Sequence, residues 1–443
     1  MPSVVINWNL YPSVTADVHV VPHRRAAVEQ TASLPRLINR GAGRSYGDAS
    51  LGEVILQHGA DRRLLAFDAE RGILEAEAGL LLDEVLQVMV PRGWFLRVTP
   101  GTRFVTLGGA VASDVHGKNH HVEGSFYDAV EALTLALPTG EVVRCSRTQR
   151  PDLFQATFGG MGLTGTILTV RLRLRPITTA YIQQHTYKAR NLDHIFRLFE
   201  THAAATYSVA WIDCVGGGTH LGRSVLLLGE HAAETDLPPA YRRRPLPVHR
   251  PPRLSMPFFL PRGVLNQQTI RLFNAFYYRR YRDDHRTLVH YGPYFYPLDG
   301  IHHWNRMYGR RGFVQYQFVI PPAQGYEGVK AVLEAMVAFG QASFLAVLKQ
   351  FGDANPAPLS FPTAGYTLAV DFPIQEKLWP FLRRLDDIVM KYGGRLYLAK
   401  DARMPADVFQ AGYPQWKTFR SFIRKLDPQR KMQSLMAQRL TLT

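Results

Sequence analysis

The sequence predicts an α+β protein with two domains. Its 443 residues are too many for one ordinary hydrophobic core, and 46% of them are hydrophobic, so the chain is able to bury two. In the first 175 residues short predicted strands alternate with glycine-rich loops and a helix, whereas later strands are accompanied by long amphipathic helices. Pro176 ends the last strand of the first part and marks the predicted domain boundary.

The first glycine loop, residues 41–48, follows a predicted strand at 37–40. It reads Gly-Ala-Gly-Arg-Ser-Tyr-Gly-Asp. Glycine adopts positive φ and exposes backbone N–H groups to an anion, so the loop is a candidate diphosphate site. The dinucleotide pattern G-x-G-x-x-G would need glycine where Tyr46 stands, which excludes a Rossmann site. A surface turn is an equal alternative from these residues alone.

Two further glycine-rich regions, 99–125 and 159–165, lie in the same part of the chain. Small residues crowd there in a way that suggests backbone lying against a large flat ligand. The other predicted elements of this part are strands at 54–56, 73–78, 129–137, 142–145 and 166–175, a helix at 80–90 and a short helix from 152.

The second part predicts an antiparallel sheet with helices on one face and polar side chains on the other. Because alternate residues of a strand share a face, Gln315 lies beside Gln317, and Lys349 shares a face with Leu345 and Val347. A solvated strand would show the same pattern. The predicted elements are strands at 207–213, 313–320, 343–349, 366–372 and 395–400, helices at 191–200, 327–339 and 376–392, and a basic helical tail at 405–443.

The net charge of +16 is concentrated in one segment. Residues 241–290 hold eleven arginines and eight aromatic residues, with two acidic residues and no lysine. Such a segment is typical of binding to nucleic acid, an anionic membrane or acidic substrates, or it is a solvated basic loop. Prolines crowd between 238 and 261 and argue against a continuous helix or central strand, so we expect a long irregular loop, followed by a helix at 267–281.

No run of 18 or more apolar residues occurs, so no transmembrane helix is expected. The N-terminal residues show no basic region followed by an apolar stretch, so no secretion signal is expected. Cys145 and Cys214 are too few for a disulfide framework or a cysteine metal site, and cytoplasmic residence is the default.

The candidate catalytic residues are a histidine cluster and one lysine. His116, His120 and His121 lie within six residues, but no carboxylate or cysteine cluster with ligand spacing accompanies them, so we predict no metal site. Lys400 is either a solvated lysine or part of a site, and the residues around it do not decide between the two.

These motifs together resemble the decaprenylphosphoryl-β-D-ribose 2-oxidase family, a branch of the vanillyl-alcohol-oxidase-type flavoproteins. The resemblance runs from about residue 30 to the C-terminus. It rests on the glycine loop of 41–48, Thr-Pro-Gly-Thr at 99–102, Gly-Gly-Ala at 108–110, His-Gly-Lys-Asn-His-His at 116–121, the glycine cluster of 159–165, Gln-Tyr-Gln at 315–317, Ser-Phe-Pro at 360–362 and Ala-Lys-Asp at 399–401.

The resemblance implies a first domain of the PCMH type, in which FAD lies extended between two α+β lobes. The first glycine loop would hold the diphosphate, and Lys400 would return to the flavin on the last strand. The residues expected to bind FAD are Gly41, Ala42, Gly43, Arg44, Ser45, Tyr46, Gly101, Thr102, Gly108, Gly109, Ser113, Val115, His116, Gly117, Asn119, Gly162, Thr164, Gly165, Ile167, Tyr397, Ala399 and Lys400.

In the implied architecture the second domain is α+β and covers the flavin with its antiparallel sheet. The residues expected to contact substrate are Trp211, Gln315, Gln317, Lys349, Phe351, Thr367, Ala369 and Lys400. The predicted division is a FAD-binding domain at 1–175, a substrate-binding domain at 176–394 that includes the basic loop 231–290, and a C-terminal segment at 395–443 that returns to the FAD domain.

The implied reaction oxidises the 2-hydroxyl of a polyprenylphosphoryl-β-D-ribose to the 2-keto sugar. A keto-sugar reductase of the same pathway then completes an epimerisation to the arabinose form. His116 is the expected base, because a neutral imidazole accepts a proton at physiological pH, and Lys400 is expected to stabilise the negative charge of reduced flavin. The lipid-linked substrate implies that 241–290 contacts a membrane surface, which places the protein in the cytoplasm or peripherally on a membrane. Nucleic acid is not an expected partner, because no recognised motif accompanies the charge.

Three positions depart from the pattern of the wider family. Tyr46 stands where a histidine often links the flavin covalently, so we expect dissociable FAD. Ala369 replaces a common cysteine and Thr367 a common asparagine, which leaves the sugar and its lipid carrier open. Two alternatives remain: a flavin oxidase of a soluble sugar or alditol, and a basic non-enzymatic protein that binds membrane or nucleic acid.

Overall fold

The computed structural model describes residues 2–252, 254–261, 263–340 and 345–443. Its N-terminal lobe is a four-stranded sheet in the order β1 (Ser3–Ile6), β2 (Ser13–Val20), β4 (Val54–Gln57) and β3 (Ile38–Arg40), with α1 (Arg24–Ser33) beside it. β2, β4 and β3 run parallel, and β1 pairs antiparallel with β2. The first glycine loop therefore leaves the end of an edge strand of this lobe.

The second lobe is a six-stranded antiparallel sheet. Its order is β5 (Leu64–Asp68), β6 (Ile73–Glu77), β10 (Thr166–Pro176), β8 (Val130–Ala136) and β9 (Val142–Ser146), and β7 (Trp94–Leu96) pairs with the end of β10. The helices of this lobe are α2 (Leu82–Met89), α3 (Leu107–Ala112), α4 (His120–Glu123), α5 (Phe126–Ala129) and α6 (Pro151–Thr157).

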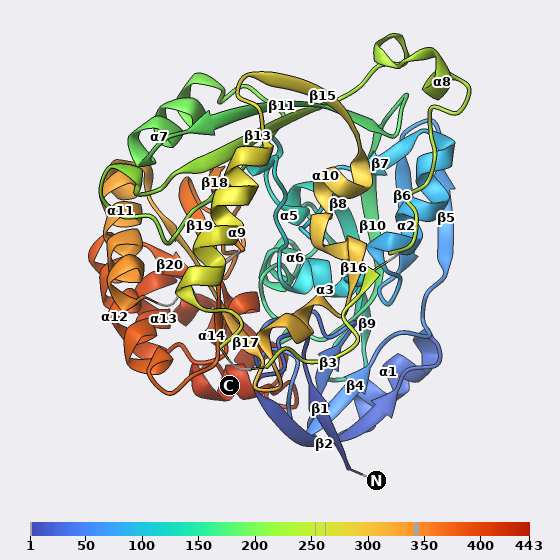
Figure 1. The fold of residues 1–443 in the computed structure, drawn as a ribbon. Coiled ribbons are helices and arrows are strands. Elements are labelled where there is room, and N and C mark those ends of the chain that lie inside the picture. Colours follow the sequence, from blue (N-terminus) through green and yellow to red (C-terminus); the bar gives the residue numbers. More distant parts are fainter. Residues whose placement is uncertain (1, 253, 262, 341–344) are drawn as a thin grey trace.

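An eight-stranded antiparallel sheet forms the second half of the molecule. Its order is β15 (His285–His290), β11 (Tyr181–Ala189), β13 (Ser224–His231), β12 (Tyr207–Ile212), β18 (Ala346–Phe351), β19 (Gly365–Pro373), β17 (Phe313–Ile320) and β20 (Arg395–Leu396). The helices α7 (Leu192–Thr201), α11 (Pro322–Phe339) and α12 (Leu378–Lys391) cover its outer face (Figure 1). The sheet is wider than the sequence predicted, because β11, β13 and β15 were not anticipated.

The basic segment is more structured than one long loop. It contains α8 (Pro239–Arg242), β14 (Leu254–Ser255), α9 (Gln267–Arg280) and β15, and β14 pairs with β16 (Ile301–His302). The helix predicted at 267–281 is present, and it begins where the Asn266 side chain accepts hydrogen bonds from the N–H groups of Gln268 and Thr269. α10 (Tyr291–Phe295) follows β15 directly.

The strand predicted at 395–400 is wrong over its second half. β20 pairs with β17 only at residues 395 and 396, and Leu398–Lys400 form a 3₁₀ turn closed by a hydrogen bond from Lys400 N to Tyr397 O (3.0 Å). Gln317 O accepts the N–H of Tyr397 and so takes the last ladder bond before the chain turns away. Lys400 therefore projects from a tight turn rather than from a strand.

The C-terminal helices α13 (Ala406–Gly412), α14 (Trp416–Leu426) and α15 (Leu435–Arg439) connect the halves of the molecule. Leu37 exchanges backbone hydrogen bonds with Lys431 and Gln433, which ties the tail to β3. Arg439 pairs with Asp48 of the first glycine loop and with Asp401 after the 3₁₀ turn, at 2.8 Å each. This guanidinium fixes the glycine loop against the Lys400 turn. The division into domains at 175 and 394 stays a prediction. β20, which that division assigns to the C-terminal segment, belongs to the eight-stranded sheet.

None of the helices in the described ranges combines the length and apolar character that a bilayer crossing needs.

Candidate functional site

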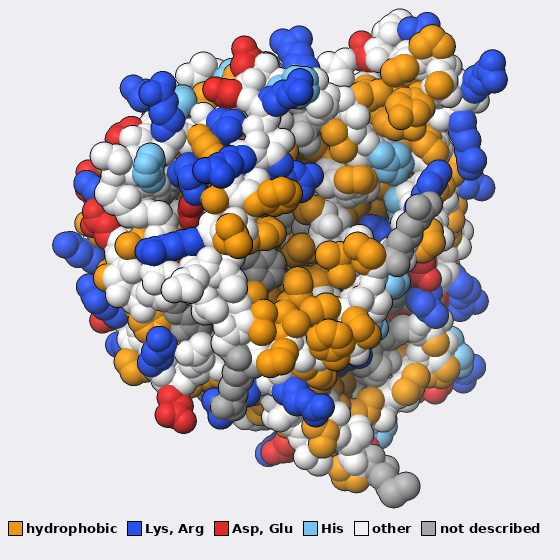
Figure 2. Space-filling model, viewed as in Figure 1, with side chains coloured by type: hydrophobic (Ala, Val, Ile, Leu, Met, Phe, Trp, Pro, Cys, Tyr) orange, Lys and Arg blue, Asp and Glu red, His pale blue; other side chains and the backbone are white. Residues whose placement is uncertain are grey.

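A cavity of about 1510 Å³ lies between the first two lobes and the inner face of the eight-stranded sheet. It opens on the face shown in Figure 2, where hydrophobic side chains surround a hollow near the centre. Ligand pockets commonly enclose ~300–1,000 Å³, so this cavity has room for a large cofactor together with a second molecule.

The first glycine loop lies on the wall of this cavity, which excludes a simple surface turn. Residues 41–46 all line the cavity. Gly43 has φ of +62°, and a Cβ on Gly47 would lie 1.8 Å from the carbonyl oxygen of Asp401. Tyr46 N donates to Ala399 O at 2.9 Å, so the loop is held by backbone contact with the Lys400 turn.

Most of the other predicted cofactor residues also line the cavity. They are Gly101, Thr102, Gly108, Gly109, Ser113, Val115, His116, Gly117, Gly162, Gly165, Ile167, Tyr397, Ala399 and Lys400. Asn119 and Thr164 do not. The Asn119 amide donates to Arg97 O at 2.9 Å, and the Thr164 hydroxyl contacts that of Thr157 at 3.1 Å, so both support the wall from behind.

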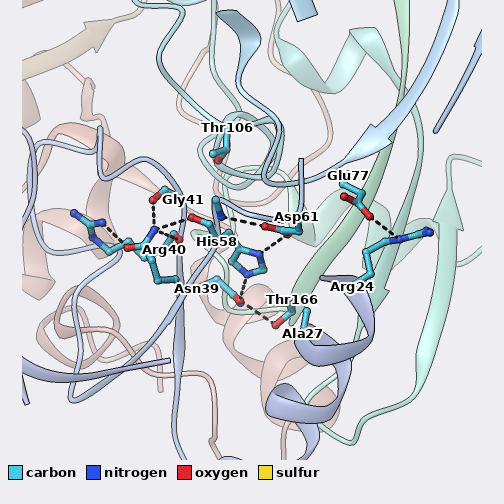
Figure 3. A network of polar contacts seen from close by, with 12 residues as sticks. Arg24, Ala27, Asn39, Arg40, Gly41, His58, Asp61, Glu77, Thr106 and Thr166 are labelled. Atoms are coloured by element: carbon cyan, nitrogen blue, oxygen red, sulfur yellow. Dashed lines mark hydrogen bonds and ion pairs between the residues drawn. The ribbon is translucent and has the colours of Figure 1, made fainter. Parts of the chain in front are cut away.

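A polar network under the first glycine loop adds His58 and Asn39 to the wall (Figure 3). His58 Nδ1 lies 2.8 Å from Asp61 Oδ2, and its Nε2 lies 3.0 Å from Asn39 Oδ1. Thr166 Oγ1 also donates to Asn39 Oδ1, at 3.0 Å. Sequence reasoning missed this network, because its members belong to no motif and Thr166 is 127 residues from Asn39.

His116 stands at the opposite end, where the lobes meet the sheet. It is 7% exposed and packs edge-on against Phe351, with ring centroids 4.6 Å apart. Its Nδ1 lies 3.1 Å from Lys349 Nζ, and its Nε2 lies 3.2 Å from Gln317 Nε2. Burial, followed by the charges of Lys349, His120 and Lys400, holds the pKa of His116 well below its usual 6.5. The imidazole is therefore neutral at physiological pH.

The three histidines of the cluster do not converge. His120 Nδ1 accepts from Gly352 N at 3.1 Å, and His121 Nε2 contacts Ala205 O at 2.8 Å. Across the described residues, no group of three or more histidine, cysteine or acidic side chains is arranged to hold a metal ion.

Lys400 lies in the cavity with its Nζ 3.5 Å from the centre of the Tyr46 ring. Burial lowers the pKa of Lys400 to about 8, and the nearby Asp371 opposes that shift. Tyr46 is itself buried, packing against Phe313 at 5.2 Å, and burial raises the pKa of its phenol well above 10. Lys400 is thus a half-buried cation held over an aromatic face rather than a freely solvated lysine.

The polar face predicted for the sheet is buried. Gln315 and Gln317 are 9% and 5% exposed, so they do not belong to a solvated strand. Gln315 donates to Asp371 Oδ1 at 2.7 Å, and burial raises the pKa of Asp371 to about 6. The predicted substrate residues that line the cavity are Trp211, Gln315, Gln317, Lys349, Ala369 and Lys400.

Phe351 and Thr367 lie behind the cavity surface. Phe351 supports the His116 ring, and the Thr367 hydroxyl accepts from Gln317 Nε2 at 3.3 Å. Lys118, which sequence reasoning left out of the site, lines the cavity and donates a hydrogen bond to Tyr294 O. It follows His116 by two positions, so the histidine motif itself was the available signal.

The family comparisons agree with this geometry. Residues 18–146 match the FAD binding domain family, and residues 368–440 match D-arabinono-1,4-lactone oxidase. The chain is 38% identical over 414 residues to the decaprenylphosphoryl-beta-D-ribose oxidase of Mycolicibacterium smegmatis, over 92% of this chain and 89% of that protein. The chain belongs to this oxidase family. It is an FAD-dependent oxidoreductase, and the predicted α+β fold with a PCMH-type FAD domain is confirmed.

Other relatives are less informative about activity. A Streptomyces coelicolor protein described as an uncharacterized protein in the mprA 5' region is 35% identical over 82% of this chain and 100% of its own length. The L-gulonolactone oxidase of Mus musculus is 30% identical over 38% of this chain and 40% of that protein. These matches support the FAD-binding assignment and leave the substrate to be argued from the site.

The residues that line the cavity suit the binding of FAD, which a member of this oxidase family requires. The cationic side chains that line it are Arg44, Arg103, Lys118, Arg250, Arg280, Lys349 and Lys400, and Asp299 is the acidic one. A glycine loop with closely packed backbone suits a diphosphate, and Lys400 suits the reduced flavin. The tyrosine at position 46 bears on how the cofactor is held.

We expect the FAD to be dissociable. Tyr46 is buried under Lys400 with a phenol held neutral, and it offers no imidazole for a covalent link. After acid precipitation of the purified protein, the flavin absorbance should remain in the supernatant. Yellow colour retained in the washed pellet would contradict this expectation.

We also expect that an inhibitor designed to modify a cysteine at position 369 will not inactivate this protein, because the residue there is alanine. Ala369 lines the cavity, whereas Cys145 and Cys214 are buried away from it. Burial raises the pKa of the Cys145 thiol to about 12, so it is not a reactive thiolate. Mass spectrometry should find no adduct on the wild-type protein and an adduct on Ala369→Cys. Time-dependent inactivation of the wild type would contradict the prediction.

Proposed function

We propose that this protein oxidises the 2-hydroxyl of the ribose in a polyprenylphosphoryl-β-D-ribose to the 2-keto sugar. The observation that carries the proposal is the convergence of His116, Gln317, Lys349 and Lys400 in one cavity behind the first glycine loop. The oxidase relative of Mycolicibacterium smegmatis, which is named for decaprenylphosphoryl-beta-D-ribose, supports the same substrate class. The 2-keto product would be consumed by a keto-sugar reductase, which completes the epimerisation to the arabinose form.

His116 is the proposed base. Bound FAD supplies the hydride acceptor, and the ribose hydroxyl has to lose its proton as the carbonyl forms. The neutral imidazole takes this proton at Nδ1 once the sugar hydroxyl replaces the Lys349 ammonium there. In this tautomer Nε2 carries the ring hydrogen, and the Gln317 amide, 3.2 Å away, would accept it through the amide oxygen. Lys400 would place a positive charge beside the bound cofactor, where it would favour the reduced form.

The proposed lipid-linked substrate would approach from a membrane surface. α9 buries Ile270 and Asn274 against the body of the protein and exposes Leu272 and Phe276, which are 74% and 67% exposed. Arg280 and Tyr281 at the end of this helix line the cavity, as does Leu254 on β14. Exposed apolar side chains on a helix whose C-terminal end lines the cavity, next to arginines, are suited to an anionic bilayer. The protein would therefore be a peripheral membrane protein.

Anaerobic titration of the purified holoenzyme tests the reaction. Farnesylphosphoryl-β-D-ribose should bleach the flavin band near 450 nm, and the corresponding arabinose compound should not. Absence of bleaching by the ribose compound would overturn the proposal.

A soluble sugar, alditol or aldonolactone is the second candidate substrate. It is favoured by the match of residues 368–440 to D-arabinono-1,4-lactone oxidase. Under the same anaerobic conditions, faster bleaching by L-gulono-1,4-lactone or by a free alditol than by the prenylphosphoryl ribose would select it.

Liposome flotation tests the proposed membrane contact. Wild-type protein should float with vesicles containing about 30% anionic lipid, and Leu272→Ser/Phe276→Ser should lose most of this binding, because two large apolar side chains leave the interface. The matched control is Val142→Ser, which removes an apolar side chain that is 50% exposed on β9. Equal flotation of the α9 variant and the control would place the membrane contact elsewhere.

A further inference from the structure

Two lysines of the cavity wall are close to His116, Lys118 in the sequence and Lys349 by direct contact. Lys118 follows His116 in the second glycine region, and its backbone carbonyl accepts a hydrogen bond from Ser208 N at 2.9 Å, which fixes the segment against β12. Lys349 stands on β18, where it lies opposite Thr367 of β19. The two ammonium groups thus come from different halves of the molecule and line one cavity, and the charge of Lys118 acts on Lys349.

Neither ammonium is neutralised by an acidic side chain within the described ranges. Lys118 Nζ donates to Tyr294 O and lies 4.4 Å from the centre of the Tyr294 ring. Lys349 Nζ contacts His116 Nδ1 at 3.1 Å and lies 5.6 Å from the centre of the Phe351 ring. An ammonium has three donor hydrogens, so each lysine keeps donors that can point into the cavity.

Burial makes this arrangement unfavourable while the cavity holds only solvent. It lowers the pKa of both lysines to about 7, and the charges of Lys118 and Lys400 contribute to the shift of Lys349. Two half-buried cations, one of which lowers the pKa of the other, are stabilised by an anion bound between them. The cavity therefore offers a site for one compact anionic group.

We propose that Lys118 and Lys349 form a phosphate subsite that holds the phosphodiester of the substrate. This inference rests on the proposed function and adds how the enzyme distinguishes a lipid-phosphate sugar from a free sugar. The subsite lies beside His116, so a phosphate bound there places the attached sugar next to the base. Lys400 remains available to the cofactor.

The subsite also couples phosphate recognition to the base. In the structure, Lys349 covers Nδ1 of His116. A phosphodiester draws the Lys349 ammonium toward itself, and the sugar hydroxyl then takes its place at Nδ1. A sugar without phosphate lacks this means of freeing the imidazole, so binding energy from the phosphate contributes to the reaction itself.

Binding of methyl farnesyl phosphate to the holoenzyme tests the subsite. This probe is a phosphodiester with a constant single charge and no sugar, and farnesyl methyl ether is its neutral counterpart. Removing a charged hydrogen-bond donor should weaken binding roughly 10-fold or more, so Lys118→Met and Lys349→Met should raise the Kd of the phosphodiester only. Lys118→Arg should retain binding, and the exposed Lys391→Met is the matched control.

The pH dependence separates this subsite from a structural role. Since a lysine binds the anion only when protonated, the wild-type Kd should rise as pH increases through about 7. Lys118→Met removes the repulsion acting on Lys349, so the pKa of Lys349 rises and the midpoint should move to higher pH. An unshifted midpoint, or a Kd unchanged in both methionine variants, overturns the subsite.

The outcome does not depend on turnover, because the probe carries no sugar. Loss of flavin bleaching with phosphodiester binding intact would defeat the proposed function alone. Equal affinity of the wild-type protein for the phosphodiester and for the ether would overturn the subsite. This comparison uses no variant, so it holds even where Lys118→Met fails to retain FAD.

Discussion

Lys400→Met is expected to slow reduction of the bound flavin by substrate about 10²–10³-fold, the usual effect of removing one group that stabilises developing negative charge. Lys400 is a half-buried cation held over Tyr46 by a 3₁₀ turn, and Arg439 fixes that turn against the glycine loop through Asp48 and Asp401. Methionine keeps much of the length and volume of the side chain. The loss should therefore appear in the chemical step rather than in FAD affinity.

Stopped-flow measurement of flavin reduction under anaerobic conditions, with the FAD Kd measured separately, checks this prediction. Lys417→Met changes an exposed lysine on α14 of the same C-terminal segment and should alter neither quantity. A pH profile gives a second check. The Lys400 cation is lost as pH rises through its pKa of about 8, so the wild-type rate should fall above that pH and the variant should lack this limb. Unaltered reduction kinetics in Lys400→Met would refute the role.

The glycine loops and the two proposed catalytic residues were the most predictable part of the cavity wall. Their signals are local: glycines at 41, 43 and 47, histidine at 116 and lysine at 400 can be read directly from short motifs. The structure adds the reason for one glycine, since a side chain on Gly47 would collide with the Asp401 carbonyl. That contact joins residues more than 350 positions apart, and no local pattern contains it.

The edge of the large sheet was not predictable in the same way. β15 reads His-Arg-Thr-Leu-Val-His and is exposed or half-buried along its length, so its sequence lacks the apolar alternation of a core strand. β17, by contrast, is buried at every residue and was predicted with its bounds. The apolar pattern that predicts a strand in the sequence comes from burial of the strand, so an exposed strand such as β15 lacks it.

The same reasoning explains which polar residues were missed. His58 and Lys118 act through partners supplied by tertiary structure, namely Asn39 for the histidine and Tyr294 for the lysine. A buried lysine and a solvated one look alike in the sequence. The strand period placed Lys349 on the face that carries Leu345 and Val347, and only the family resemblance made it an expected substrate contact.

His116→Gln should reduce the rate of flavin reduction about 10²–10⁴-fold, the range that general bases contribute. Glutamine preserves hydrogen bonding toward Gln317 and Lys349 but accepts no proton at neutral pH. His121→Gln is the matched control, because His121 lies in the same motif, contacts Ala205 O and does not line the cavity. Its reduction rate should stay close to that of the wild type.

The pH profile of the wild type distinguishes a catalytic His116 from a structural one. A base works when it is unprotonated, and burial with three neighbouring positive or ionisable groups holds the pKa of His116 well below 6.5. The rate of flavin reduction should therefore stay level as pH falls through 6.5 and decline only at lower pH. Together with the Lys400 limb, this gives a plateau that extends up to about 8 when the substrate is saturating. A fall in the rate centred near pH 6.5 would mean that a solvated group takes the proton. An unchanged rate in His116→Gln would assign proton removal to another residue of the cavity.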